Sequence, residues 1–101
     1  MAADQPDAGT HILVKGRVQG VGFRDFVKQS ADKAGVTGWV RNLRDGQVEA
    51  LLKGAPDAVQ AVLDDIGRGP PAARVEEVVT RPALAHEGSP VPGLLEVRRT
   101  A

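Results

Sequence analysis

The sequence predicts an α+β domain in which two helices cover one face of an antiparallel sheet. Along the chain, apolar residues change between a period of two, typical of strands, and a period near 3.6, typical of helices. Glycine or proline stands at most of these changes. In chain order the segments read β-α-β-β-α-β, which predicts the split βαβ, ferredoxin-like architecture with right-handed crossovers.

The first strand and the first helix are predicted on either side of a glycine-rich loop. Residues His11–Val18 alternate so that Ile12 and Val14 share one face, as in a strand with a buried side. From Phe23 onward, apolar residues recur at helical spacing. Gly35 follows the last of them, and we expect it to end the helix.

The second and third strands form a predicted hairpin. The segments Val36–Leu43 and Gln47–Lys53 are joined by Arg44-Asp45-Gly46. An Asp-Gly pair between two such segments is typical of a hairpin, because glycine tolerates the positive φ that a tight turn needs.

The second half of the chain repeats the helix-then-strand order. We expect a helix that begins at Pro56 and is ended by Gly67 and Gly69, with an apolar stripe of Val59, Val62, Leu63 and Ile66. Val75–Arg81 is predicted as a fourth strand, and its imperfect alternation indicates a bulge or bend. Ala83–Gly93 reads as a loop, and Leu94–Arg99 is compatible with a short fifth strand at an edge.

Composition excludes several function classes. The 101 residues include thirteen basic and thirteen acidic side chains, so the formal net charge is zero and no global field favours nucleic acid or an anionic membrane. The chain has no cysteine, which excludes disulfides, thiolate metal sites and a cysteine nucleophile. Any attraction for an anion must therefore be local.

The length predicts one domain, over residues 10–101. Residues 1–9 are polar and acidic, without the basic start and apolar stretch of a signal peptide, and we expect them to form a disordered tail. We expect a cytoplasmic monomer with no membrane or nucleic-acid partner.

The segment Gly16–Arg24, which reads GRVQGVGFR, predicts an anion site. Glycines at 16, 20 and 22 allow successive backbone N–H groups to turn toward one point. The helix that begins just afterwards adds unpaired N–H groups and the positive end of its dipole. Arg24 adds a rigid fork of donors. The spacing fits neither the Walker nor the dinucleotide-binding pattern, and glycine-rich loops of this kind often bind nothing.

A second motif, Gly38–Asn42, ends the second predicted strand. If the first strand-helix-strand unit folds as predicted, its two strands are parallel and Asn42 lies at the same sheet edge as the loop. A carboxamide has both a donor and an acceptor, so Asn42 is suited to hold a water molecule beside the bound anion.

Together these two motifs resemble those of the acylphosphatases. The first is V-K-G-R-V-Q-G-V-G-F-R, from Val14 to Arg24, and the second is G-W-V-R-N-x-x-x-G-x-V-x-x-x-x-x-G, from Gly38 to Gly54. The resemblance extends over nearly the whole chain in length and element order. It implies hydrolysis of the carboxyl-phosphate bond of acyl phosphates, with no metal or other cofactor.

The resemblance also implies roles for particular residues. Arg24 corresponds to the arginine that binds the phosphoryl group, and Asn42 to the asparagine that positions the attacking water. The backbone amides that we expect to bind phosphate are those of Gln19, Gly20, Val21, Gly22, Phe23 and Arg24. Leu43 departs from family members that carry a hydroxyl residue directly after the asparagine, which puts the fine tuning of the site in doubt.

The remaining aromatic and histidine residues have simpler interpretations. Phe23 fits the apolar stripe of the first helix and is expected in the core. Trp39 is expected on the opposite, less covered face of the sheet as an ordinary surface aromatic. His11 and His86 lack partners at metal-ligand spacing, so we expect solvated surface histidines and no metal site.

Two other functions remain as alternatives. RNA-recognition modules share this architecture but need aromatic residues on the central strands, and both phenylalanines here fall on the first helix. A phosphate-binding accessory module without turnover is the second. This alternative is considered because an acylphosphatase-like unit also occurs fused at the start of the hydrogenase-maturation carbamoyltransferases.

Overall fold

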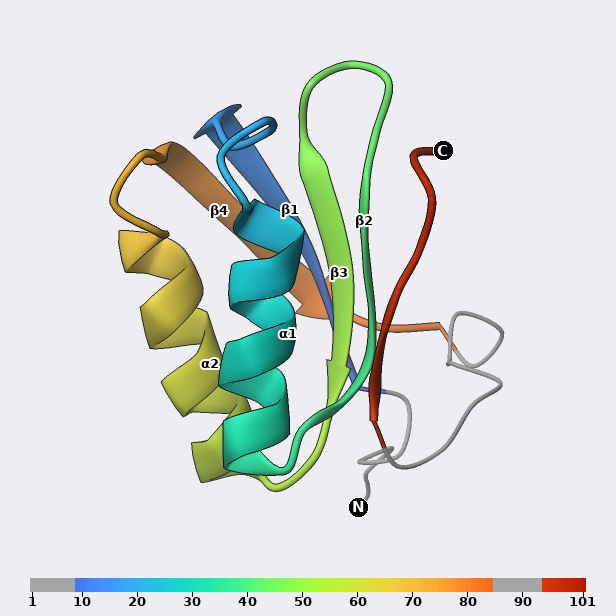
Figure 1. The fold of residues 1–101 in the computed structure, drawn as a ribbon. Coiled ribbons are helices and arrows are strands. Elements are labelled where there is room, and N and C mark those ends of the chain that lie inside the picture. The colour runs from blue at the N-terminus through green and yellow to red at the C-terminus, as the bar shows by residue number, and fades with distance from the viewer. Residues whose placement is uncertain (1–8, 85–93) are drawn as a thin grey trace.

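A computed structural model describes residues 9–84 and 94–101 of the chain. The elements follow the predicted order (Figure 1): β1 (Thr10–Arg17), α1 (Phe23–Ala34), β2 (Thr37–Asn42), β3 (Val48–Lys53), α2 (Pro56–Arg68), β4 (Arg74–Pro82) and β5 (Leu95–Val97). Residues 1–8 of the tail predicted over 1–9, most of the loop before β5, and His86 lie outside the described residues.

The five strands form one sheet in the order β4-β1-β3-β2-β5. β1 pairs antiparallel with both β3 and β4, and β2 pairs antiparallel with β3, as predicted for the first four strands. The short edge strand β5 is present, and it runs parallel to β2, so the complete sheet is mixed. Because β1 and β2 both run antiparallel to β3, they are parallel to each other and end on the same side.

Both helices pack on one face of the sheet and enclose the core (Figure 1). The predicted stripe of α1 is buried at Phe23, Val27 and Ala31, which confirms the core position of Phe23. The stripe of α2 is buried at Val59, Val62 and Ile66. The sheet contributes alternate residues, which are Ile12, Val14, Val40, Val48, Ala50, Leu52 and Leu95.

The local signals placed most boundaries within a residue or two. The end of α2 falls between the two expected glycines, because the helix continues through Gly67 to Arg68 and is capped by Gly69, with φ 69°. The bulge predicted in the fourth strand is present, because Lys15 faces Glu77 while Gly16 faces Val75. A glycine inside a helix lowers stability but does not end the helix when the flanking turns remain packed.

The face of the sheet away from the helices is covered where we expected it to be open. Trp39 is 3% exposed and forms a second cluster with Leu51 and Ala83, so the expectation of a surface aromatic is wrong. Two guanidinium groups cover its ring, with their central carbons 5.0 Å (Arg41) and 4.7 Å (Arg98) from the ring centroid.

The expectation of a solvated His11 is also wrong. His11 is 3% exposed, and its Nε2 donates to Glu49 Oε2 at 2.7 Å. Arg41 Nε donates to the other oxygen of the same carboxylate at 2.6 Å. Burial raises the pKa of Glu49, but the hydrogen bonds and charges of His11 and Arg41 outweigh it, so this pKa lies below its ordinary value of 4.5.

No helix among residues 9–84 and 94–101 is long and apolar enough to cross a membrane.

A methyl group at Gly38 should disrupt the β2–β3 pairing. Gly38 has φ 128°, and a Cβ there would lie 1.8 Å from the carbonyl oxygen of Leu51. Gly38→Ala should therefore lower the free energy of unfolding by about 2–4 kcal/mol in urea titrations. Gly35→Ala is the matched control, because Gly35 also has a positive φ but has open space around a Cβ, and it should cost about 1–2 kcal/mol. Equal losses would contradict the steric explanation.

The lowered pKa of Glu49 should make stability depend on acid pH. The folded state holds this carboxylate ionised, so its stabilising contribution is present above pH 4.5 and is lost as pH falls through the folded pKa. Glu49→Gln should be less stable than the wild type at pH 7, with a difference that shrinks toward pH 3. Urea unfolding at both pH values measures this, and a difference independent of pH would refute it.

Candidate active site

The loop between β1 and α1 is shaped by two glycines in the left-handed region. Gly20 has φ 73°, and Gly22, with φ 76° and ψ 24°, is the N-cap of α1. No side chain caps this helix end, so the N–H groups of its first turn remain available to a ligand. A Cβ built at either glycine would meet no atom within 4 Å, which leaves open space directly over the loop backbone.

Gln19 fastens this loop to the β2–β3 hairpin. Its side-chain Nε2 donates to the carbonyl oxygens of Leu43 at 2.7 Å and Gln47 at 2.8 Å. The hairpin is itself held by Asp45, whose pKa lies below its ordinary 3.8 because the backbone and side chain of Gln47 donate to the carboxylate. Sequence reasoning considered only the backbone amide of Gln19 and missed the role of its side chain.

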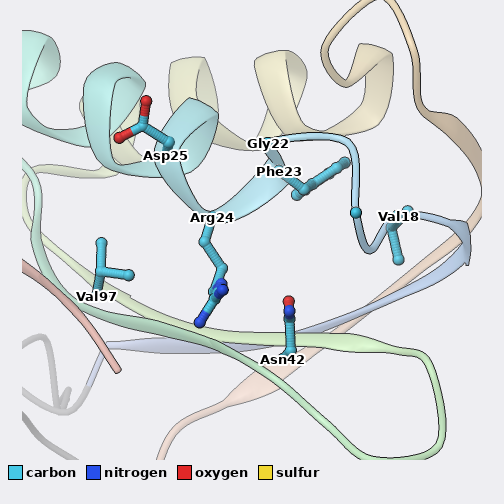
Figure 2. A pocket seen from close by; sticks show the side chains of 8 residues that line it. Val18, Gly22, Phe23, Arg24, Asp25, Asn42 and Val97 are labelled. Carbon is cyan, nitrogen blue, oxygen red and sulfur yellow. The ribbon is translucent and has the colours of Figure 1, made fainter. Parts of the chain in front are cut away.

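Arg24 and Asn42 line the same cavity, as the parallel arrangement of β1 and β2 predicted. Figure 2 shows the Arg24 side chain reaching down from α1 and the Asn42 side chain rising from β2 toward it. The cavity has a volume of about 280 Å³ and is lined by Val18, Gly20, Gly22, Phe23, Arg24, Asp25, Asn42 and Val97.

The structure brings together four of the six residues whose amides were expected to bind phosphate. Gly20, Gly22, Phe23 and Arg24 line the cavity, whereas Gln19 and Val21 do not.

The end of the chain contributes to the site in a way that the sequence did not indicate. Arg24 Nη1 donates to the carbonyl oxygen of Arg98 at 3.0 Å, and Val97 lines the cavity. The backbone N–H of Ala101 donates to the carbonyl oxygen of Asn42 at 2.9 Å. The loop, the hairpin and the C-terminal residues therefore meet at one end of the molecule (Figure 1).

Two charged residues, Arg24 and Asp25, line the cavity. Arg24 points into the cavity, while the exposed carboxylate of Asp25 points away from Arg24 and Asn42 (Figure 2) and accepts from Gln29 at 3.1 Å. Among the residues that the structure describes, no three His, Asp or Glu side chains gather in a way that could hold a metal ion.

This arrangement can bind a tetrahedral oxyanion and hold a water molecule beside it. Backbone donors, the helix dipole and a guanidinium fork all favour negative charge at the floor of the cavity. The Asn42 carboxamide offers a donor and an acceptor from the opposite wall.

Comparison with known proteins agrees with this geometry. The family model "Acylphosphatase" matches residues 10–88. An acylphosphatase of Bordetella parapertussis is 51% identical over 70 residues, which span 69% of this chain and 74% of the relative. An acylphosphatase of an Acidovorax species is 48% identical over 90 residues, or 87% and 93% of the two chains.

Solved structures give the same result. The structure of an acylphosphatase from Coxiella burnetii superposes with a TM-score of 0.80 at 33% identity, covering 90% of this chain and 92% of that one. Both the sequence match over most of the chain and the shared fold lead to one assignment. The chain belongs to the acylphosphatase family.

Proposed function

We propose that the cavity between α1 and β2 is the active site in which this acylphosphatase hydrolyses acyl phosphates. The Arg24 guanidinium and the amides of Gly20, Gly22, Phe23 and Arg24, which line the cavity, bind the phosphoryl group. Asn42 orients the attacking water. The observation that carries this proposal is that Arg24 and Asn42, from different elements, line one cavity over a glycine-rich loop.

The chemistry of the substrate suits a site made of donors. Phosphoryl transfer passes through a loose transition state with negative charge on the peripheral oxygens, so fixed donors stabilise it more than they stabilise the ground state. Water forms a bond to phosphorus as the phosphorus–carboxylate bond breaks. The carboxylate departs with the bonding electron pair, and because it is weakly basic it needs no general acid.

Asn42 acts through orientation rather than as a base, since a carboxamide does not take up a proton near neutral pH. Holding water and phosphorus in line removes part of the entropic barrier, which is worth up to about 7–11 kcal/mol for well-oriented reactants. The proton of the attacking water passes to a phosphate oxygen, which gives inorganic phosphate and the free carboxylate.

The experiment that tests this proposal follows benzoyl phosphate hydrolysis by the purified chain, with and without a chelator. Turnover that persists in the chelator supports metal-free hydrolysis, and turnover that it abolishes contradicts this. A chain that binds inorganic phosphate without turnover would be an accessory binding module instead. The cytoplasmic location and the monomeric state remain predictions, which cell fractionation and sedimentation would test.

Substitution of Arg24 should separate its charge from its geometry. Arg24→Lys keeps the cation but loses the planar fork, and Arg24→Ala loses both. We expect both variants to fold, as judged by circular dichroism, and to lose about a hundredfold or more in kcat/KM for benzoyl phosphate. Wild-type turnover in either variant would refute the proposed role.

Substitution of Asn42 should affect catalysis more than binding. In Asn42→Ala the water loses its orienting group while the phosphate site keeps its donors. We expect kcat to fall by about a hundredfold and the inhibition constant of inorganic phosphate to change by less than about threefold. Equal losses in both quantities would mark Asn42 as a structural residue.

A further inference from the structure

The C-terminal segment, Arg98–Ala101, makes backbone contacts with both proposed site residues. The carbonyl oxygen of Arg98 accepts from Arg24 Nη1 at 3.0 Å. At the other end of the segment, the N–H of Ala101 donates to the carbonyl oxygen of Asn42 at 2.9 Å. This segment, drawn in red, runs beside β2 from the edge strand to the top of the molecule in Figure 1.

Both the backbone and the side chain of Arg98 make contacts that hold this residue in place. Its backbone N–H donates to the carbonyl oxygen of Val40 at 2.8 Å, which extends the β5 pairing beyond Val97. Its guanidinium carbon lies 4.7 Å from the centroid of the Trp39 ring, on the face away from the helices, and its Nε donates to Glu96 at 3.1 Å. Because Trp39 is buried, its ring offers the Arg98 guanidinium a rigid platform.

Arg24 needs such a support because an arginine side chain loses considerable rotamer entropy when it is immobilised. One hydrogen bond to a fixed carbonyl restricts the guanidinium before any ligand arrives. The group has five N–H donors, so several remain for a phosphoryl group. A pre-oriented side chain binds its ligand more tightly because less freedom is lost on binding.

We propose that Arg98 is a positioning residue, whose stacking on Trp39 fixes the carbonyl that orients Arg24 toward the phosphoryl group. This inference rests on the proposed role of Arg24. Arg98 is not among the residues that line the cavity. Arg24 is retained when Arg98 is substituted, so the cost of ordering its side chain falls on the binding step, and the bound guanidinium then acts as it does in the wild type.

The test compares Arg98→Ala with Arg99→Ala. Both variants lose one cation, at neighbouring positions of the chain. In Arg98→Ala we expect the KM of benzoyl phosphate and the inhibition constant of inorganic phosphate to rise together, by about threefold to tenfold, with kcat within about twofold of the wild type. Arg99→Ala should behave as the wild type.

Trp39 supplies an independent readout, because it is the only tryptophan in the chain. Loss of the stacked guanidinium should increase acrylamide quenching of its fluorescence in Arg98→Ala and not in Arg99→Ala. If quenching increases while KM and the inhibition constant stay at wild-type values, the proposal is wrong. If Arg98 were only structural, its loss would reduce the fraction of folded protein, which lowers the apparent kcat and leaves KM unchanged. That result would also overturn the proposal.

Arg98→Lys carries the same test if Arg98→Ala does not fold. Lysine keeps the charge and the aliphatic stem but loses the planar group over Trp39, so a raised KM with normal thermal unfolding supports the proposal and an unchanged KM opposes it. The Arg24→Ala variant separates the two proposals. If it binds phosphate as the wild type does, the role of Arg24 fails; if it does not, while Arg98→Ala does, only the positioning role fails.

Discussion

The pairing of β1 and β2 with the same central strand, β3, is the constraint on which the site depends. Both strands run antiparallel to β3, so both end on the same side of the sheet. The glycine-rich loop follows the end of β1, and Asn42 stands at the end of β2. A reversal of either pairing would place the Arg24 loop and Asn42 at opposite ends of the molecule, about the length of a strand apart.

Two glycines allow neighbouring strands to approach closely enough to pair. Gly38 lies where the main chain of β3 leaves no room for a side chain, and Gly16 lies beside a bulge in β4, where a Cβ would come within 2.2 Å of a carbonyl oxygen. Gly20 and Gly22 serve a different purpose. Open space surrounds them, so their positive φ shapes the loop and leaves room for a ligand.

The two faces of the sheet carry different kinds of interactions. The helix-covered face holds the main hydrophobic core, from which Asn42 emerges at the strand end. The other face carries a polar and aromatic network in which His11 and Arg41 share the carboxylate of Glu49 and two arginines cover Trp39. Because Arg41 precedes Asn42 and Arg98 contacts Arg24, this network lies directly behind the site. Its burial and charge pairing stiffen the strand ends that carry the two residues.

The sequence by itself determined the element order, the hairpin turn, the glycine-rich loop before α1 and the placement of Arg24 and Asn42 at one cavity. These features are encoded locally, by the spacing of apolar residues and by glycine at fixed offsets, so they can be read without knowledge of distant contacts. The prediction that Asn42 would lie near Arg24 needed only one tertiary assumption, the usual crossover of a strand-helix-strand unit.

Only the tertiary structure decided which residues support the site from a distance. The burial of His11 and Trp39, the clamp from Gln19 to Leu43 and the contact between Arg24 and the Arg98 carbonyl all join segments far apart in the chain. No local pattern distinguishes them, because a strand sequence does not state its neighbours, its register or the direction of a three-residue edge strand such as β5. A carbonyl oxygen, moreover, is present in every residue, and only the fold determines which one an arginine meets.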